Sequence, residues 1–331
     1  MHRRITINSN FIPLTDLCAA ARPVGRWVAV ITLCVGLAAC GDSGSNGNAP
    51  PAPTAGTLLI ANGDDSVTAC AVDANGAIGR CQLTPTPGLA MAGSLEIAGN
   101  RAYLGNLADS NFAICDLGAD GKLSGCIEPD DGDTLWSPMG IVVTGSRLYA
   151  TNEGGSVALC ALDGGGLPIS CGLAAPKGTF QEPSGAAMAQ GFFFVADHDA
   201  DIVAACQVLA DGKLGPCSRQ AIGGMLDKPA GVTASGSRLY VTNLHDDSIV
   251  SCLVTPTGEL QDCAKSVQTA PLETPTDIAI NGNKAYVTNL VSHTVATCDI
   301  DANWHVSTCT AGQAGGTFRY PGSLAFVPAS R

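Results

Sequence analysis

The chain has 331 residues and a formal net charge of −12, and it contains 40 glycines and 15 cysteines but only 5% aromatic residues. An acidic chain without clusters of lysine and arginine is poorly suited to bind nucleic acid or to dock electrostatically on anionic lipid, so we expect no nucleic-acid partner. Abundant glycine predicts a domain with many tight turns.

Residues 1–39 are predicted to be a lipoprotein signal peptide. The apolar stretch Trp27–Ala39 follows Arg22 and Arg26 and is too short to span a bilayer comfortably. It ends in Leu37-Ala38-Ala39-Cys40, which resembles the lipobox of bacterial lipoproteins. That resemblance implies acylation of Cys40 and a membrane anchor. Gly41, directly after this cysteine, resembles the sorting residue of lipoproteins that are sent to the outer membrane. Ordinary signal cleavage beside an incidental cysteine is the alternative.

Residues 40–56 follow as a predicted flexible tether, rich in Gly, Ser, Asn, Pro and Ala. From residue 57 to residue 331 the sequence repeats, with units that start near residues 57, 101, 147, 192, 238 and 284. Each unit contains four short runs of β-type residues. This organisation predicts an all-β fold, a six-bladed β-propeller with four-stranded blades.

Two cysteines in each repeat are separated by eleven positions. A turn sequence such as Asn75-Gly76 falls at the midpoint of most pairs, which predicts a hairpin. A two-residue loop would place the two cysteines opposite each other, whereas a three-residue loop with a glycine bulge would shift the register by one. We predict six disulfides rather than metal sites, because no histidine recurs beside them. The pairs are Cys70/Cys81, Cys115/Cys126, Cys160/Cys171, Cys206/Cys217, Cys252/Cys263 and Cys298/Cys309.

The two ends of the repeat region complement each other. No small-residue strand precedes Thr57, whereas the chain ends in a spare copy of that strand, Pro321–Val327. We therefore expect the C-terminal strand to complete the N-terminal blade and close the ring without an exposed sheet edge.

The motif Tyr-Val-Thr-Asn is intact at Tyr240–Asn243 and Tyr286–Asn289 and degenerate in the other four repeats. It resembles the YVTN family of β-propeller repeats, and this resemblance implies the fold but not one activity. That family and its lactonase-like and NHL-type relatives include enzymes, binding modules and surface proteins. The polar residue that ends the motif recurs six times, which predicts a turn cap and not a catalytic group. These residues are Asn62, Asn106, Asn152, Asp197, Asn243 and Asn289.

Candidate functional residues should lie where the blades differ, in the loops around the central channel. His198 with Asp199, His245 with Asp246, and His293 lie there in three consecutive repeats. Histidine and aspartate are common metal ligands, but the three histidines stand at different offsets from the cap, so exposed polar loop tips are the alternative.

We expect a lipid-anchored binding or scaffolding module of the bacterial cell envelope that faces the periplasm or the cell surface and has a protein or small-molecule partner at the channel face. No cofactor and no catalytic residue is expected. A metal-dependent lactonase-like hydrolase that uses the channel is the alternative, and a purely structural surface protein is a third possibility.

Overall fold

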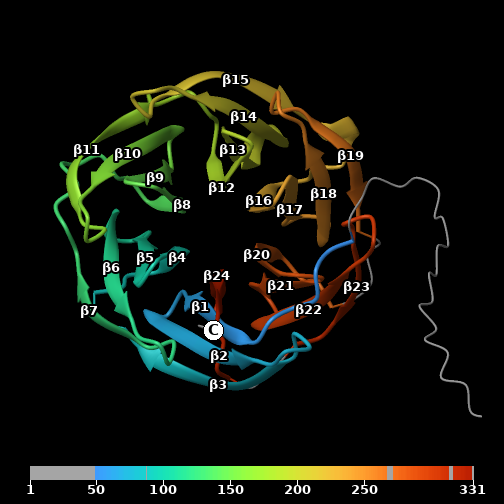
Figure 1. The fold of residues 1–331 in the computed structure, drawn as a ribbon. Helices are drawn as coiled ribbons and strands as arrows, with labels where there is room; N and C mark the ends of the chain where they lie inside the picture. Colours follow the sequence, from blue (N-terminus) through green and yellow to red (C-terminus); the bar gives the residue numbers. More distant parts are fainter. Residues whose placement is uncertain (1–48, 87, 267–270, 313–315, 330–331) are drawn as a thin grey trace, which may run out of the picture. The chain divides into compact units, whose positions relative to one another are not determined.

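The computed structural model describes residues 49–86, 88–266, 271–312 and 316–329. Within these residues the chain forms six four-stranded antiparallel sheets, arranged as the blades of a β-propeller around a central channel (Figure 1). The predicted fold class is therefore confirmed. The segments predicted to be a signal peptide and a tether, with Cys40 between them, lie wholly or mostly outside the described residues, so these assignments stay predictions. No helix in the described part is long and apolar enough to cross a membrane.

Each blade runs from an innermost strand at the channel to an outermost strand at the rim. Blade 1 is β24 (Pro321–Pro328), β1 (Gly56–Asn62), β2 (Ser66–Val72) and β3 (Ile78–Pro85). Blade 2 is β4 (Ala92–Ala98), β5 (Arg101–Asn106), β6 (Asn111–Leu117) and β7 (Leu123–Ile127). Blade 3 is β8 (Pro138–Thr144), β9 (Arg147–Asn152), β10 (Ser156–Leu162) and β11 (Pro168–Ala175).

The second half repeats this order. Blade 4 is β12 (Pro183–Ala189), β13 (Phe192–Asp197), β14 (Ile202–Val208) and β15 (Leu214–Gln220). Blade 5 is β16 (Pro229–Ser235), β17 (Arg238–Asn243), β18 (Ser248–Val254) and β19 (Leu260–Lys265). Blade 6 is β20 (Pro275–Asn281), β21 (Lys284–Asn289), β22 (Thr294–Ile300) and β23 (Val306–Thr310). The described residues also contain two short 3-10 helices, η1 (His198–Ala200) and η2 (Ile222–Gly224).

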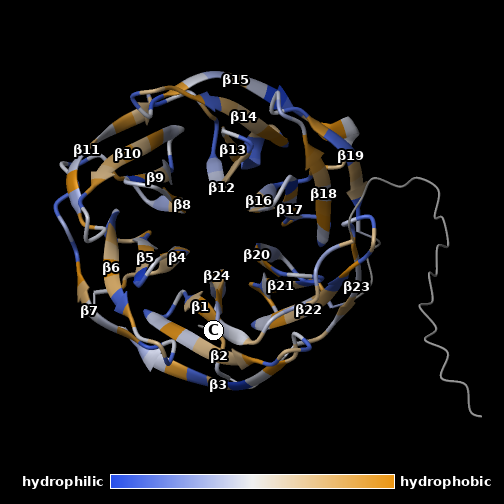
Figure 2. Ribbon diagram, in the orientation of Figure 1, coloured by the Kyte–Doolittle hydropathy of each residue, from blue (hydrophilic) through white to orange (hydrophobic). Residues whose placement is uncertain are grey.

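The hydrophobic core is divided among the interfaces between blades. Six clusters of buried side chains are found in the described residues, and each combines residues of two neighbouring blades. Figure 2 shows the apolar middle strands β14 and β18, which are covered on both faces, beside more hydrophilic stretches of the rim strands β3 and β15. Because each blade buries its faces against two neighbours, the ring has to close for every blade to be covered.

Ring closure follows the predicted arrangement. β24 pairs with β1 in antiparallel register, with Leu324 opposite Ile60 and Phe326 opposite Leu58. The segment just before β1 is also held, because Thr54 and the side chain of Asn281 on β20 exchange hydrogen bonds of 2.8–3.2 Å. The first and last described segments therefore meet at blades 6 and 1.

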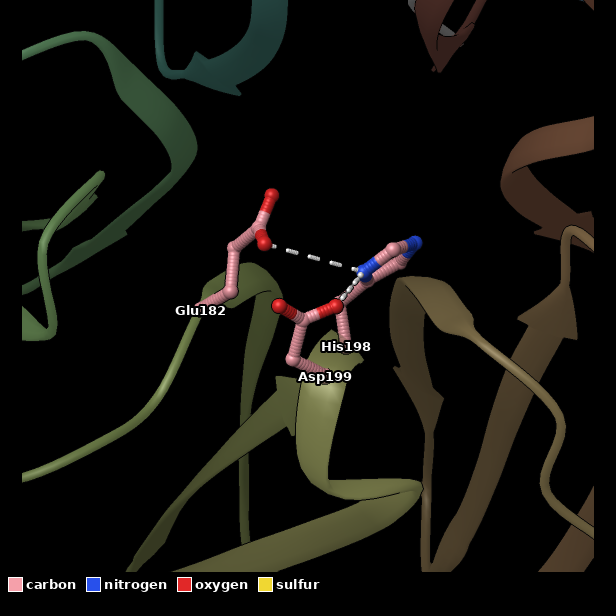
Figure 3. Close-up of side chains that lie close together, drawn as sticks. All are labelled: Glu182, His198 and Asp199. Carbon is pink, nitrogen blue, oxygen red and sulfur yellow. Dashed lines mark hydrogen bonds and ion pairs between the residues drawn. The ribbon is translucent and has the colours of Figure 1, made fainter.

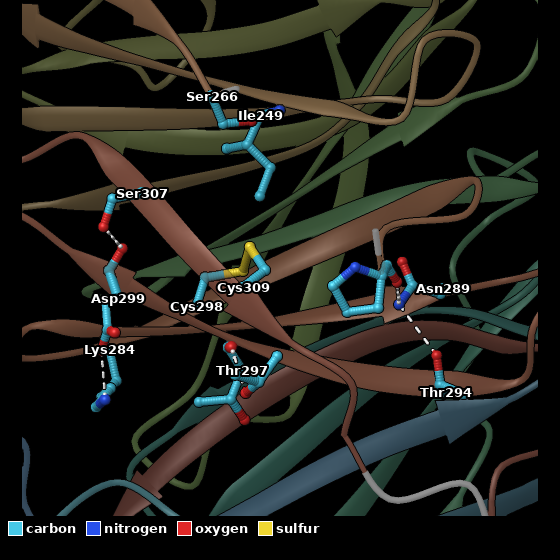
Figure 4. Close-up of a disulfide and its surroundings, with 12 residues drawn as sticks. Ile249, Ser266, Lys284, Asn289, Thr294, Thr297, Cys298, Asp299, Ser307 and Cys309 are labelled. Atoms are coloured by element: carbon cyan, nitrogen blue, oxygen red, sulfur yellow. Dashed lines mark hydrogen bonds and ion pairs between the residues drawn. A yellow bond between two sulfur atoms is a disulfide. The ribbon is translucent and has the colours of Figure 1, made fainter. Parts of the chain in front are cut away.

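The six predicted disulfides are present, and each joins the third and outermost strands of one blade. Figure 4 shows the bond of blade 6 between β22 and β23. In chain order the bonds are Cys70–Cys81, Cys115–Cys126, Cys160–Cys171, Cys206–Cys217, Cys252–Cys263 and Cys298–Cys309.

The loop geometry expected for these hairpins needs a correction, because neither simple alternative is sufficient by itself. In blade 1, the Asp73 N–H donates to the Ala77 carbonyl across a three-residue loop that has Gly76 at φ 79°. A bulge between this loop and the disulfide then restores Cys70 opposite Cys81. The other five blades have the same offset between turn and cysteines.

The bulge does not fall at the same place in every blade. In blades 3 and 4 it follows the disulfide, so Cys171 and Cys217 remain directly opposite their partners in the strand ladder, as Cys81 does. In blades 2 and 5 the register shifts at the first cysteine itself. Cys126 and Cys263 therefore lie beside the bulge and do not form the regular cross-strand pair that was expected. The disulfide forms in either arrangement.

The two cysteines of a pair also differ in burial. The first cysteine of every pair is buried in the interface between blades. The second lies on the rim strand and is only partly buried, except in blade 6, where Cys309 is 8% exposed. The partly buried residues are Cys81, Cys126, Cys171, Cys217 and Cys263. Each disulfide therefore ties an exposed rim strand to the core.

Candidate functional site: the central channel and its mouth

The six cap residues hold the loops that lead to the innermost strands. Asn243 is typical: its Oδ1 accepts a hydrogen bond from the Asp227 N–H at 3.2 Å, and its Nδ2 donates to the Met225 carbonyl and to Ser248 Oγ, both at 2.9 Å. All six caps are buried, with at most 1% exposure. The prediction of a structural role is confirmed, since these side chains form hydrogen bonds with backbone groups of the loops.

Blade 4 differs because its cap is Asp197, which has no amide group to donate. Arg219 of β15 donates from Nη2 to Asp197 Oδ2 at 3.0 Å, and its Nη1 lies 3.5 Å from the Thr179 carbonyl. That carbonyl occupies the place of the Met225 carbonyl in blade 5. The guanidinium therefore supplies both the missing donor and a positive charge for a carboxylate that is fully buried.

Of the predicted metal-ligand candidates, the structure brings together His198 and Asp199, with Glu182 beside them (Figure 3). One ligand atom from each of these three residues lies within 4.8 Å of the other two, and no other such group is found in the described residues. His198 Nδ1 is 3.1 Å from Asp199 Oδ1 and 4.0 Å from Glu182 Oε2. The cluster sits on blade 4 at the channel mouth.

Lys228 forms an ion pair with this cluster. Lys228 Nζ donates to Asp199 Oδ1 at 2.7 Å, and this hydrogen bond, with those from Glu182 and His198, lowers the pKa of Asp199 to about 2. Burial, followed by the neighbouring Asp199, raises the pKa of Glu182. A cation that bound here would have to compete with the ammonium group of Lys228. The geometry therefore fits a polar ion-pair network and a metal centre equally well.

The remaining candidates lie apart from this cluster and have other partners. His245 Nδ1 is 3.0 Å from Asp227 Oδ1, with the histidine side chain 75% exposed. Asp246 forms an ion pair with Lys265 and accepts a hydrogen bond from Ser248. The His293 ring packs against Tyr320 at 4.4 Å between ring centroids. The three histidines therefore do not form one site.

A cavity of about 670 Å³ opens from the same mouth into the channel. Its rim has an apolar arc over blades 5, 6, 1 and 2, formed by Leu244, Leu290, Tyr320, Met91 and Leu107. Met91, Thr274 and Tyr320, each directly before an innermost strand, have φ of 51–54°, a left-handed conformation that is uncommon for residues with a side chain. Below the rim the wall consists mainly of small and aliphatic side chains.

Two carboxyl groups interrupt this apolar wall, Glu96 on β4 and Asp277 on β20. The pKa of Glu96 is raised to about 8, mainly by burial and to a smaller extent by the Asp277 charge, while a hydrogen bond from the Val143 backbone opposes the shift. Burial likewise raises the pKa of Asp277 to about 6. Asp277 retains hydrogen bonds from Ser323 Oγ at 2.6 Å and from the Ile278 N–H at 2.8 Å.

Neither carboxyl was among the sequence candidates, although a signal for them exists. The innermost strands align by their pairing with the second strands, and residues opposite the motif tyrosine or its equivalent are small or aliphatic, with Glu96 as the exception. The others at this position are Val142, Ala187, Thr233, Ala279 and Ala325. Asp277 stands where the other blades have Ser94, Gly140, Gly185, Gly231 and Ser323. An alignment of the six innermost strands would have identified both positions.

These features define a β-propeller with disulfide-closed blades and a central cavity. Comparison of the sequence with protein-family models and with curated proteins finds no match. Among solved structures, the chain is similar to one in a nidogen/laminin complex, with 15% identity, a TM-score of 0.64 and coverage of 83% of this chain and 99% of that one.

Two lactonase structures are also similar. A putative 6-phosphogluconolactonase from Bacteroides uniformis has 16% identity and a TM-score of 0.57, with coverage of 81% and 84% of the two chains. The periplasmic gluconolactonase PpgL from Pseudomonas aeruginosa has 16% identity and a TM-score of 0.56, with coverage of 84% and 100%. At such identities the likeness shows a shared propeller fold alone.

Proposed function

We propose that this protein is a binding module of the cell envelope that holds a small, mainly apolar ligand in its central channel. The observation that carries the proposal is the cavity of about 670 Å³, whose wall and rim are mostly apolar. Small-molecule sites are typically concave, apolar and of this size, with a few polar groups that set orientation. A scaffolding role at the rim is compatible with the same surface.

The neutral apolar fluorophore N-phenyl-1-naphthylamine tests this proposal. The propeller, residues 49–331, contains all six inter-blade cores and its own closing strand, so it can be secreted without the anchor. We expect saturable binding of one probe molecule. Thr233→Trp, which fills the cavity, should abolish it, whereas Ile169→Arg removes a side chain that is 70% exposed on the rim strand β11 and should not affect it. Absence of binding, or equal loss in both variants, would contradict the proposal.

A hydrolase is the second candidate, and the two channel carboxyls favour it. Glu96 with a pKa of about 8 is protonated at neutral pH, while Asp277 with a pKa of about 6 is ionised. Two carboxyls with separated pKa values are the usual arrangement of a general acid and a general base. A panel of lactones and esters, assayed with the propeller and with Glu96→Gln, tests this candidate: turnover that the variant abolishes would support it.

The location that we propose is outside the cytoplasm, with an acyl chain on Cys40 as the membrane anchor. Six disulfides support an oxidising compartment, where such bonds persist. The anchor rests on the lipobox-like residues Leu37-Ala38-Ala39-Cys40. The buried capping role of the Asn that ends the repeated motif supports a relationship with YVTN-type repeats.

A further inference from the structure

The two channel carboxyls lie on either side of blade 1. Glu96 belongs to the innermost strand of blade 2, and Asp277 belongs to that of blade 6, with β24 between them (Figure 1). Both line the cavity, and the Asp277 charge acts on Glu96. Two like charges in one apolar channel repel each other and are poorly solvated, so ionisation of both is unfavourable unless a cation lies near them.

No positively charged side chain of the described residues lines this cavity to compensate the two carboxylates. The lining includes neither Lys nor Arg nor His. The Val143 N–H is the backbone donor to Glu96, and Asp277 receives hydrogen bonds from Ser323, Leu324 and Ile278. This contrasts with the blade 4 carboxylates Asp197 and Asp199, which have an arginine and a lysine partner.

A third polar group in the same cavity is unpaired in the described structure. Ser94 on β4 lines the cavity two residues before Glu96, and it is only 4% exposed. Its Oγ forms no hydrogen bond with the described residues, whereas Ser323 Oγ, at the same position in blade 1, donates to Asp277 and accepts from the Leu95 N–H at 3.0 Å. This Oγ is itself enclosed and lies against Gly105 of β5, so the ligand site is assigned to the two carboxylates alone.

We propose that the channel ligand is an amphipathic amine whose protonated nitrogen lies between the Glu96 and Asp277 carboxylates, while its apolar body contacts the arc from Leu244 to Leu107. This inference rests on the proposed binding function and specifies its ligand class. An ammonium group has three donors and one positive charge, which match two carboxylates in an apolar channel. Anionic ligands, including phosphorylated ones, are repelled by the same groups.

Three eight-carbon probes of equal shape but different charge test the proposal: n-octylamine, 1-octanol and octanoate, each titrated at pH 7 against the propeller carrying N-phenyl-1-naphthylamine. We expect octylamine to displace the probe at concentrations at least about tenfold lower than octanol, because the charge-assisted contacts are worth more than about 1.4 kcal/mol. Octanoate should be the weakest of the three.

Variants then assign the charge preference to its residues. Glu96→Gln and Asp277→Asn should each remove most of the preference for octylamine and leave octanol binding within about twofold. Glu259→Gln, at an exposed turn outside the cavity, is the matched control and should retain the preference. Circular dichroism and intact disulfides confirm folding of each variant.

Proton release gives an independent readout. Titration calorimetry at pH 7 in two buffers of different ionisation enthalpy should show release of up to one proton with octylamine and none with octanol, because the ammonium ion favours the ionised form of Glu96. Asp277 on β20 is the charged side chain that acts on Glu96, and β8 contributes only the Val143 N–H. The release should disappear in Glu96→Gln.

The outcomes separate the two proposals. Equal binding of octanol and octylamine would show that the amine inference is wrong while the binding function stands. A preference for octylamine that survives both Glu96→Gln and Asp277→Asn would place the cation elsewhere and would also overturn the inference. If neither octanol nor octylamine displaces the fluorophore, or the fluorophore itself does not bind, both the ligand class and the binding function are wrong.

Discussion

At the scale of single residues, the repeat is most informative where one blade departs from it. Asn is the cap in five blades because its amide oxygen accepts from the loop backbone while its Nδ2 donates. The Nδ2 group donates to a loop carbonyl in blades 2, 3, 5 and 6, and to the Ser66 and Thr68 hydroxyls in blade 1. Asp197 keeps the acceptor and loses the donor, and Arg219 replaces the donor from a different strand. Asp197 on β13 and Arg219 on β15 therefore act together as the cap of blade 4.

A double-mutant cycle tests this pair. Arg219→Ala should lower the free energy of unfolding by about 2–4 kcal/mol, since it leaves a buried carboxylate unpaired, reduced somewhat by the half-exposed position of the guanidinium. Asp197→Asn in the same variant should restore most of the loss, because the amide recreates the pattern of the other blades. Urea denaturation measures both. Additive effects of the two changes would contradict the pairing.

The Glu96 pKa predicts a pH dependence of stability. A carboxyl whose pKa is raised from 4.5 to about 8 by folding stabilises the native state fully below pH 4.5, and this contribution is lost as the pH rises toward 8. Glu96→Gln should therefore flatten the fall in melting temperature between pH 5 and pH 8. Glu259→Gln serves as the control, and an unchanged slope in Glu96→Gln would show that Glu96 ionises freely.

At the scale of strands and turns, the tyrosines of the motif link neighbouring blades. Tyr149 donates to the Gly212 carbonyl of the next blade's rim turn at 2.9 Å, and Tyr286 donates to that of Gly76 at 3.0 Å across the ring closure. Phe194 lacks the hydroxyl, and there Gln220 Nε2 donates to the Gly258 carbonyl instead. The Tyr240 hydroxyl is buried, with no partner among the described residues.

This difference predicts opposite results for the same substitution. Tyr149→Phe should cost about 1–2 kcal/mol of unfolding free energy, because it leaves the Gly212 carbonyl without its donor. Tyr240→Phe should be neutral or stabilising, because it removes a buried hydroxyl that has no partner among the described residues. Both variants keep the aromatic ring and the packing, so each is the control of the other. Equal losses would show that the hydroxyls contribute nothing specific.

The elements also show why part of the structure could be predicted from sequence and part could not. Strand positions, the pairing of Cys70 with Cys81 and closure by β24 follow from local periodicity, which one repeat confirms for the next. The sequence does not determine the bulge beside Cys70, because glycine at the turn permits several loop lengths. Glu96 and Asp277 stand out in the sequence only when the six innermost strands are aligned with one another, and they line one cavity only because the ring closes.

At the scale of the whole molecule, the anchor remains a prediction that one change can test. Cys40→Ser should abolish acylation and leave the precursor uncleaved, because the cysteine thiol is the group to which lipid is attached. Detergent-phase partitioning and mass spectrometry of the mature N-terminus measure the two effects. Ser45→Ala, a neighbouring change in the predicted tether, should mature normally. Normal processing of Cys40→Ser would show that the lipobox-like residues are incidental.

The disulfide pattern has a consequence for biogenesis. Every bond joins a cysteine to the next cysteine along the chain, eleven residues later. In a chain exported from its N-terminus, as we propose, each pair would therefore be complete before the following one emerges. An oxidase that joins thiols in order of appearance produces the native set without any reshuffling, provided that no extra thiol comes first. Cys40 is that extra thiol in a chain cleaved before it, and acylation would remove it from the reaction. The lipid would then act as a protecting group during oxidative folding as well as an anchor.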